Sequence, residues 1–274
     1  MRVIDPHSHM TSRTTDDYRA IRRAGVECVI EPAFWSGSDK QHPESFFDYF
    51  EHIIDFETER AERVAGVDHY VTVAINPKEA DDREMAEAVI EKLPEYFERD
   101  RVVGVGEIGF NLQTDTEEWA FREQLRLADD HGMPVIIHLP HTEKPKGAVR
   151  TVDIIEEMGV EQSRIIIDHN EPDTIETTRA TDCWTGFTLY PGKIDIETVE
   201  GMFEEYGTDR MILNSSADWD DSNPLAVPEA RDYLVDAGWS RREVRKLVYE
   251  NPREFFSQSP NFDFDRDSTP QVVA

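Results

Sequence analysis

The sequence has few of the features that mark secreted, membrane or redox proteins. Its two cysteines, Cys28 and Cys183, are too few for a disulfide framework, and they form no Cys-x-x-Cys zinc or redox motif. No apolar run approaches the roughly 18 residues that a membrane span requires, and no basic, apolar leader precedes the first apolar run. We therefore expect a cytoplasmic protein with buried thiols and no membrane partner.

Positive charge is also scarce. Lysine occurs seven times, and 29 basic residues face 58 acidic ones, which gives a net charge of −29. The acidic residues are spread along the chain, as in proteins of halophiles, where molar salt shortens the Debye length to about 3 Å and screens self-repulsion. Such a surface disfavours long nucleic acids, because phosphate binding requires clustered basic residues. We expect a halophilic background and a small substrate, and the composition leaves the oligomeric state open.

The sequence does contain a regular alternation of short apolar runs with amphipathic, acidic segments. The predicted strands begin with the run that ends at Asp5 and continue at 28–31, 68–75, 101–109, 134–139, 164–169, 184–190 and 210–214. Helical segments lie between them, for example at 44–66, 78–100 and 117–132, and the last ends in glycine as helices often do. Eight strands that alternate with helices predict a parallel sheet covered by helices.

The length of about 250 residues for eight such units predicts an α/β fold, a single-domain (β/α)8 TIM barrel. We place the barrel at 1–258 and a loosely ordered tail at 259–274; an open doubly wound sheet is the alternative. The barrel is favoured because polar residues follow most predicted strands, and the carboxyl ends of barrel strands converge on one mouth. These residues include His7, His9, Glu31, Asn76, Glu107, His138, His141, His169, Asn170 and Asp218.

The pair His7 and His9 is the first metal-site signal in this set. Side chains two residues apart on a strand point the same way, so two imidazoles in this spacing can hold one metal ion. Alone, the pair also fits two solvated loop histidines. Together with the later imidazoles and carboxylates it suits zinc, manganese or iron, and carboxylate-rich sites also accept magnesium. We expect one to two divalent metal ions at the mouth.

Five segments in order resemble the TatD-related branch of the amidohydrolase-like metal-dependent hydrolases: DPHSHM at 5–10, VGEIGF at 105–110, PVIIHLPH at 134–141, IDHN at 167–170 and SSADW at 215–219. The resemblance implies a barrel with one to three divalent metals at its mouth. It also implies roles for six residues. His7 and His9 bind the first metal, Glu107 bridges two metals, His138 and His169 bind the second, and Asp218 contacts the first metal and is the general base.

Two departures from the family pattern indicate a divergent subgroup with a different substrate. The family usually has Leu-Glu-Thr-Asp at the last strand, whereas here the acid of the run 213–218 comes two residues later, so Asp220 or Asp221 are alternatives to Asp218. At the fourth strand the family often continues Gly-Leu-Asp, and here Asn111 replaces that carboxylate.

Loops after the predicted strands carry five of the seven lysines, namely Lys40, Lys78, Lys144, Lys146 and Lys193. On an otherwise acidic molecule they predict a positive funnel for a small anionic substrate. The segment 31–45 is long enough for a lid, and its aromatic residues with Trp219 suit a flat or apolar group. We predict substrate contacts from His141, Lys144, Lys146, Lys193, Glu31, Trp35 and Asn170.

These observations favour a metal-dependent hydrolase in which a metal-activated water attacks an anionic ester, in the first place a phosphoester. A nuclease or a nucleotide or phosphometabolite hydrolase fits this description. The alternatives are a hydrolase of amides, lactones or cyclic amides with the same metal chemistry, and a barrel that binds a metal or metabolite without turnover.

Overall fold

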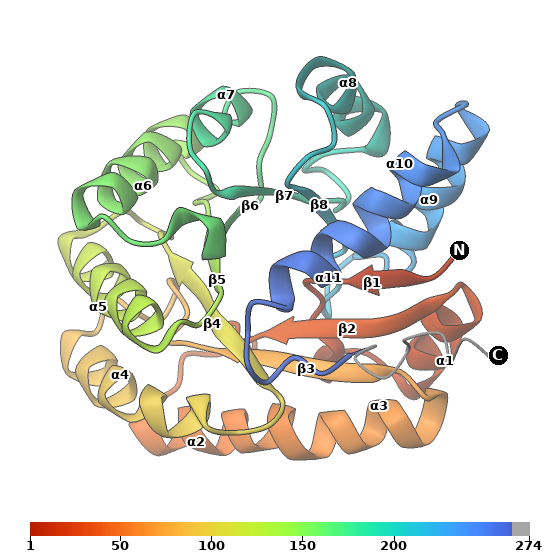
Figure 1. Cartoon of the computed structure of the whole chain (residues 1–274). Helices are drawn as coiled ribbons and strands as arrows, with labels where there is room; N and C mark the ends of the chain where they lie inside the picture. Colours follow the sequence, from red (N-terminus) through yellow and green to blue (C-terminus); the bar gives the residue numbers. More distant parts are fainter. Residues whose placement is uncertain (265–274) are drawn as a thin grey trace, which may run out of the picture.

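The computed structural model describes residues 1–264 and has eight parallel strands in the order β1 to β8, surrounded by helices (Figure 1). This is the predicted TIM barrel. Its strands are β1 Val3–Asp5, β2 Val26–Pro32, β3 Asp68–Val73, β4 Val102–Gly109, β5 Val135–His138, β6 Ile165–Asp168, β7 Trp184–Thr188 and β8 Met211–Asn214. Each predicted strand matches one of these within a few residues.

The helices are α1 Thr15–Arg23, α2 Pro43–Glu51, α3 Thr58–Ala65, α4 Arg83–Phe97, α5 Asp115–His131, α6 Lys144–Met158, α7 Ile175–Arg179, α8 Ile196–Tyr206, α9 Ala226–Asp236, α10 Arg241–Arg245 and α11 Asn251–Phe256. Wide π-helical turns at His52–Glu57 and Lys246–Glu250 continue α2 into α3 and α10 into α11. No helix of residues 1–264 is both long and apolar enough to cross a bilayer.

Local sequence explains where these elements begin and end. The Thr14 side chain accepts a hydrogen bond from the Asp17 amide, and the Asp17 side chain accepts one from the Thr14 amide, so a capping box starts α1. Gly132 ends α5 in the left-handed conformation, with φ of 65°. The three isoleucines 165–167 of strand β6 suit a strand whose one face is covered by helices and whose other face lies in the barrel interior, and all residues of the strand are buried.

Contacts beyond the strand ends close the barrel between β8 and β1. The Ser216 amide donates to the His7 carbonyl, and the His9 amide donates to the Ala217 carbonyl, each at 2.8 Å. Under these contacts the buried Asp5 carboxylate accepts a hydrogen bond from the Ser215 hydroxyl at 2.6 Å. The first histidine pair is therefore fastened directly to the segment after the last strand.

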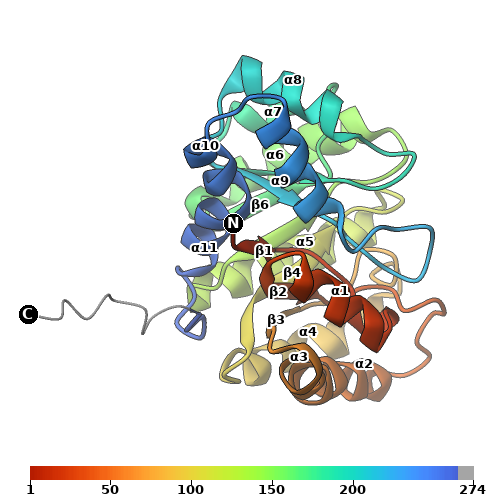
Figure 2. The ribbon, with the colours of Figure 1, turned by 90° about the vertical axis from the view of Figure 1, so that its right-hand side faces the viewer.

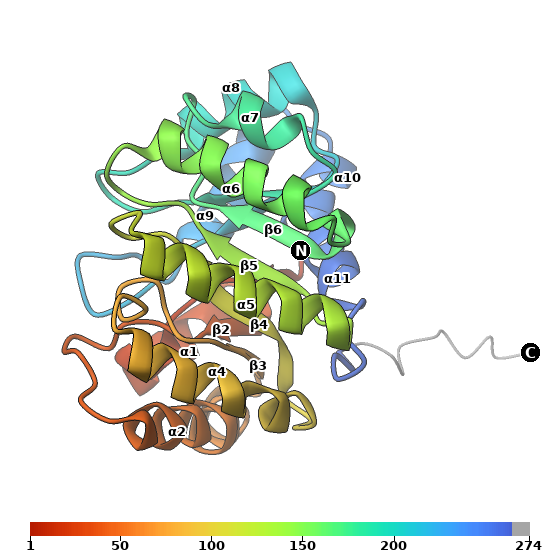
Figure 3. The ribbon, with the colours of Figure 1, turned by 90° about the vertical axis from the view of Figure 1, so that its left-hand side faces the viewer.

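The loops after the strands project from one end of the barrel, and the N-terminus and α11 lie at the opposite end (Figures 2 and 3). At that opposite end Phe262 is buried against Tyr70, with ring centroids 4.9 Å apart, and Phe264 is also buried. The Asn261 side chain donates to the Phe97 carbonyl at 2.8 Å. The packed chain thus extends through residues 259–264, which we expected in a loose tail, while 265–274 lie outside the described residues.

Candidate metal centre

The carboxylate of Glu107 on β4 lies among four imidazoles at the mouth. Its Oε1 is 3.5 Å from His7 Nε2, 3.2 Å from His138 Nδ1 and 3.2 Å from His169 Nε2. Its Oε2 is 3.9 Å from His9 Nε2. All five side chains are buried except that of His138, which is half-buried. The structure therefore brings together five of the six residues that we predicted as metal ligands.

A buried network orients two of these imidazoles. Thr188 has one hydroxyl hydrogen and directs it to Asn214 Oδ1 at 2.9 Å, so His169 Nδ1, 2.6 Å from the hydroxyl, is the donor toward Thr188. Asp168 accepts from the Asn214 amide at 2.9 Å and from His7 Nδ1 at 2.7 Å. In their neutral forms, His7 and His169 therefore both turn the lone pair of Nε2 toward Glu107.

The donor set fits a divalent cation. His7 Nε2 and His9 Nε2 approach to 3.1 Å, and both also face Glu107. A single proton can bridge only two of these nitrogen and oxygen atoms. A metal cation between them can accept lone pairs from all of them at once. Two groups of ligand atoms lie within 4.8 Å of one another and share the Glu107 carboxylate: His7, His9 and Glu107, and Glu107, His138 and His169. Imidazoles with one shared carboxylate suit zinc, manganese or iron.

Electrostatics within the cluster set the protonation states. Burial works against the charged form of Glu107, but the neighbouring imidazoles of His7, His138 and His169 outweigh it and hold the pKa of Glu107 well below its usual range. Burial and the nearby His7 lower the pKa of His9 to about 3. For His7 itself, burial is outweighed by Glu107 and Asp168, which raise the pKa. At neutral pH the metal-free cluster therefore holds an anionic Glu107 and a neutral His9.

Metal binding is expected to release a proton. Because the pKa of His7 is raised above its ordinary value of 6.5, its proton is retained to higher pH and must leave when the nitrogen binds a metal. We expect affinity to rise with pH as His7 loses its proton, and metal binding at lower pH to release a proton from this imidazole. Calorimetry of the metal-free protein in buffers of different ionisation enthalpy measures the number of protons released.

The matched control for this titration is His131→Ala, which removes an imidazole from the end of α5, where Nδ1 only contacts the Leu127 carbonyl. It should leave the released proton count unchanged. Equal affinity for zinc at pH 5.5 and pH 8 would show that no ligand proton competes with the metal.

Asp168 belongs to the site although the sequence analysis did not select it. Its neighbour His169 has φ of 63°, so the strand has ended and the two adjacent side chains do not point to opposite faces. Left-handed backbone at a non-glycine residue costs energy and is concentrated at functional sites. The available sequence signal was the acid directly before the predicted ligand His169, but strand alternation argued against it.

Asp218 lies away from the Glu107 cluster. Its Oδ1 accepts hydrogen bonds from the Tyr190 hydroxyl and the Asp220 amide, both at 2.9 Å. Burial and this carboxylate raise the pKa of Tyr190, so the phenol keeps its proton and donates it. Among residues 1–264, no group of potential ligand atoms includes Asp218 or the alternatives Asp220 and Asp221. The structure therefore puts the predicted acid in the cavity wall and not among the ligands.

A cavity of about 380 Å³ opens beside the cluster. Phe34, Trp35 and Trp219 line one part of it, and His141 lines it beside the cluster. Its lining residues are His9, Phe34, Trp35, Asn76, Pro77, Lys78, Glu107, Asn111, His138, His141, His169, Tyr190, Lys193, Ser216, Asp218, Trp219 and Asp220. Of the predicted substrate contacts, His141, Trp35 and Lys193 reach this cavity.

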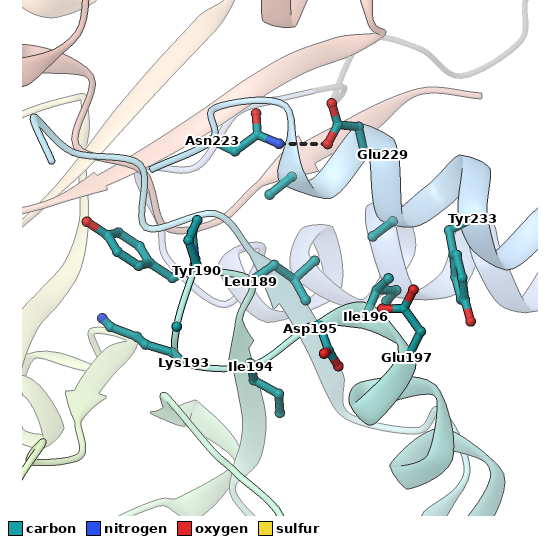
Figure 4. Close-up of a pocket in the computed structure, with 14 residues that line it drawn as sticks. Leu189, Tyr190, Lys193, Ile194, Asp195, Ile196, Glu197, Asn223, Glu229 and Tyr233 are labelled. Carbon is teal, nitrogen blue, oxygen red and sulfur yellow. Dashed lines mark hydrogen bonds between the residues drawn. The ribbon is translucent and has the colours of Figure 1, made fainter. Parts of the chain in front are cut away.

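A second cavity, of about 640 Å³, shares Tyr190 and Lys193 with the first (Figure 4). In Figure 4 these two side chains extend together from the loop after β7, away from Glu197 and Tyr233. Within residues 1–264, none of the potential metal-ligand groups lines the second cavity. We therefore place the functional site in the smaller cavity.

Two predicted substrate contacts are used inside the protein instead. The Glu31 carboxylate is fully buried against His69 Nε2, at 2.8 Å. The Asn170 side chain donates to the Ile167 carbonyl at 2.7 Å and stabilises the turn after β6. Both polar groups are satisfied within the fold, so our prediction that they contact substrate was wrong.

The predicted funnel of five lysines is reduced to two. The other three lysines pair with carboxylates, two of them across segments that are separate in sequence and one within the first turn of α6. Lys40 binds Glu79 at 3.1 Å, Lys146 on α6 binds Glu143 at 3.4 Å, and the buried Lys144 binds Glu171. Within residues 1–264, Lys78 and Lys193 have no carboxylate within 4.0 Å, and both line the cavity.

The chain is similar in sequence to known metal-dependent hydrolases. The family profile described as "TatD related DNase" matches residues 4–257. An uncharacterized metal-dependent hydrolase of Methanocaldococcus jannaschii is 29% identical over 255 residues, which cover 93% of this chain and 99% of that protein.

Solved structures of other proteins have the same fold. A TatD-like protein of Archaeoglobus fulgidus superposes with a TM-score of 0.77 and 26% identity, over 93% of this chain and 99% of that chain. A mutant of an organophosphorus hydrolase from Deinococcus radiodurans shares the fold, with a TM-score of 0.68 at 15% identity over 93% of this chain and 92% of that chain.

Proposed function

The chain belongs to the family of TatD related DNases and is a metal-dependent hydrolase, and on that premise we propose that it cleaves a small anionic ester, in the first place a phosphoester. One observation carries the proposal. The Glu107 cluster opens into a cavity whose two lysines, Lys78 and Lys193, have no carboxylate within 4.0 Å in the described part of the chain. On a molecule of net charge −29, such a cavity is a place where an anion is attracted.

Charge also supports the proposed setting. The net charge of −29 suits a cytoplasmic enzyme in concentrated salt. It disfavours polymeric nucleic acid, whose phosphates would be repelled by most of the surface.

The residues of the chain divide the work in this proposal. Divalent ions held by the Glu107 cluster would lower the pKa of water and polarise the ester. His7 and His169 are the oriented nitrogen donors, because Asp168 and Thr188 hold their opposite ring nitrogens. Glu107 remains ionised next to four imidazoles and is suited to bridge two cations.

Proton transfer and substrate binding fall to residues of the cavity wall. Asp218 is held by the Tyr190 hydroxyl and faces the cavity, so we propose that it accepts the proton of the attacking water from there. Lys193 extends over the Tyr190 ring, with Nζ 4.5 Å from the centroid, and would neutralise the anionic group. His141, whose pKa burial and His138 lower to about 3, is a neutral polar contact.

Replacing Lys193 tests the anionic substrate. Lys193→Gln should lower kcat/KM for a phosphodiester by roughly 10- to 100-fold, mainly through KM, because a charge-assisted contact is lost. Assays should use the full-length protein with zinc, manganese, magnesium or iron across phosphodiesters, phosphomonoesters, lactones and amides. Lys146→Gln, at an exposed lysine on α6, is the matched control and should leave both constants unchanged.

The panel also decides against the proposal if it is wrong. If only lactones or amides are turned over, the enzyme is a hydrolase of carboxylic esters or amides and not of phosphoesters. A Lys193→Gln variant with unchanged KM for every anionic ester would remove the role of this lysine.

A further inference from the structure

Three aromatic side chains form a wall of the metal cavity, which we call the aromatic wall: Phe34 and Trp35 after β2, and Trp219 after β8. Phe34 stacks on His9 of the cluster, with centroids 3.8 Å apart and planes 11° apart. Trp219 contacts Phe34 at 5.0 Å and Trp35 at 5.7 Å between centroids. The wall therefore runs without interruption from a candidate metal ligand to the cavity rim.

Trp219 is unusually open for such a residue. Its exposed fraction is 45%. Five large apolar side chains of residues 1–264 are exposed, and among these five Trp219 alone lines the metal cavity. The others are Met1, Phe56, Leu112 and Val149. An indole left exposed inside a functional cavity offers a surface for a flat ring, because aromatic pairs gain energy beyond simple burial.

Positive charge lies on this wall and elsewhere in the cavity lining. Lys78 Nζ is 3.4 Å from the centroid of Trp35, and Lys193 lies over Tyr190. Each of the other five lysines of the chain has a carboxylate within 4.0 Å. The two lysines that remain available for a ligand are thus held on aromatic rings at the same cavity.

Cavity size limits what can occupy this arrangement. At about 380 Å³ the cavity is near the lower end of the range for small-molecule sites. This space suits one ring system with one anionic group. A polynucleotide would also have to approach a surface of net charge −29.

We propose that the cavity selects a small ester in which an anionic group is joined to a single aromatic or heteroaromatic ring. The ring stacks on Trp219, and the anionic group lies between the Glu107 cluster and Lys193. Trp219 is the specificity-determining residue in this arrangement. The inference rests on the proposed function, because the same cavity holds the hydrolytic site.

Binding of two non-hydrolysable probes to the full-length, metal-loaded protein tests the inference. We expect phenylphosphonate to bind roughly two- to tenfold more tightly than methylphosphonate, by calorimetry, because of the stacked ring. Trp219→Ala and Trp219→Leu should both abolish that difference, and the leucine variant keeps an apolar side chain in the wall. Phe56→Ala, which removes another exposed aromatic ring that does not line the cavity, should preserve it.

The outcomes separate this inference from the proposed function. Equal affinity of the two probes, or an equal loss for both in the Trp219 variants, overturns the aromatic selectivity even if phosphoesters are hydrolysed. Trp219-dependent binding without any phosphoester turnover supports the aromatic anion site and contradicts the hydrolytic proposal. Faster hydrolysis of single-stranded DNA than of a phenyl phosphodiester, judged by kcat/KM, overturns the small-ligand assignment.

Turnover gives a second readout. Trp219→Leu should raise KM for a phenyl phosphodiester roughly two- to tenfold and leave kcat nearly unchanged, since stacking is the same in the ground and transition states. An equal change in KM for a methyl phosphodiester would contradict the stacking role.

Discussion

Glu107→Gln is expected to reduce kcat/KM by about 10³-fold or more, because the metals supply several kcal/mol of transition-state stabilisation. The amide removes the carboxylate that two of the three groups of potential ligand atoms in residues 1–264 share. It also introduces an N–H donor that can hydrogen-bond to the imidazole nitrogens facing position 107, in competition with a metal ion. Retained metal per chain should fall together with activity.

Metal content by elemental analysis and steady-state kinetics on the same preparation check this expectation. Glu91→Gln, at an exposed position on α4, is the matched control and should match the parent in both measurements. Full metal content with full activity in the Glu107→Gln protein would show that the shared carboxylate is not part of the centre.

Asp168→Asn should lower metal affinity or activity by roughly 10- to 100-fold, the usual effect of removing the partner that orients a metal-binding histidine. Asp168 accepts from both His7 Nδ1 and the Asn214 amide. An asparagine at position 168 has an NH2 group in place of one acceptor oxygen. This group would either face the N–H donor of Asn214 or leave His7 Nδ1 without an acceptor. A buried polar group without a partner costs about 1–3 kcal/mol.

Metal titration and chemical denaturation measure the two consequences separately. Asp173→Asn, on the exposed turn that follows the same strand, changes an equivalent charge outside the network and should change neither. If Asp168→Asn binds zinc as tightly as the parent, the network does not orient His7.

The strand positions show how much of the fold is encoded locally. The apolar runs at 101–109 and 164–169 correspond to β4 and β6. Both strands could be predicted locally, because a strand that is buried on both faces is a short apolar run between turn residues. Likewise, the segment 44–66 is helical through α2 and α3. The end of the packed chain was misjudged, because Phe262 and Phe264 are buried by Tyr70 and other residues distant in sequence.

The candidate site divides in the same way. Residues at strand ends, such as Glu107 and His138, were predictable because barrel topology brings every strand end to one mouth. The partners of the side chains there were not predictable. Asp218 reached Tyr190 and not the cluster, and Lys144 reached Glu171 and not the cavity.

The sequence by itself therefore determined the barrel and the position of its mouth, since these follow from periodicity, and the family resemblance selected the five residues of the Glu107 cluster among the polar residues at the strand ends. Tertiary structure alone decided that Asp168 orients His7, across 161 residues, and that two lysines remain available to a ligand. The physical reason is that a hydrogen bond or ion pair depends on distances of a few ångströms. Only the closed barrel sets such distances between remote segments.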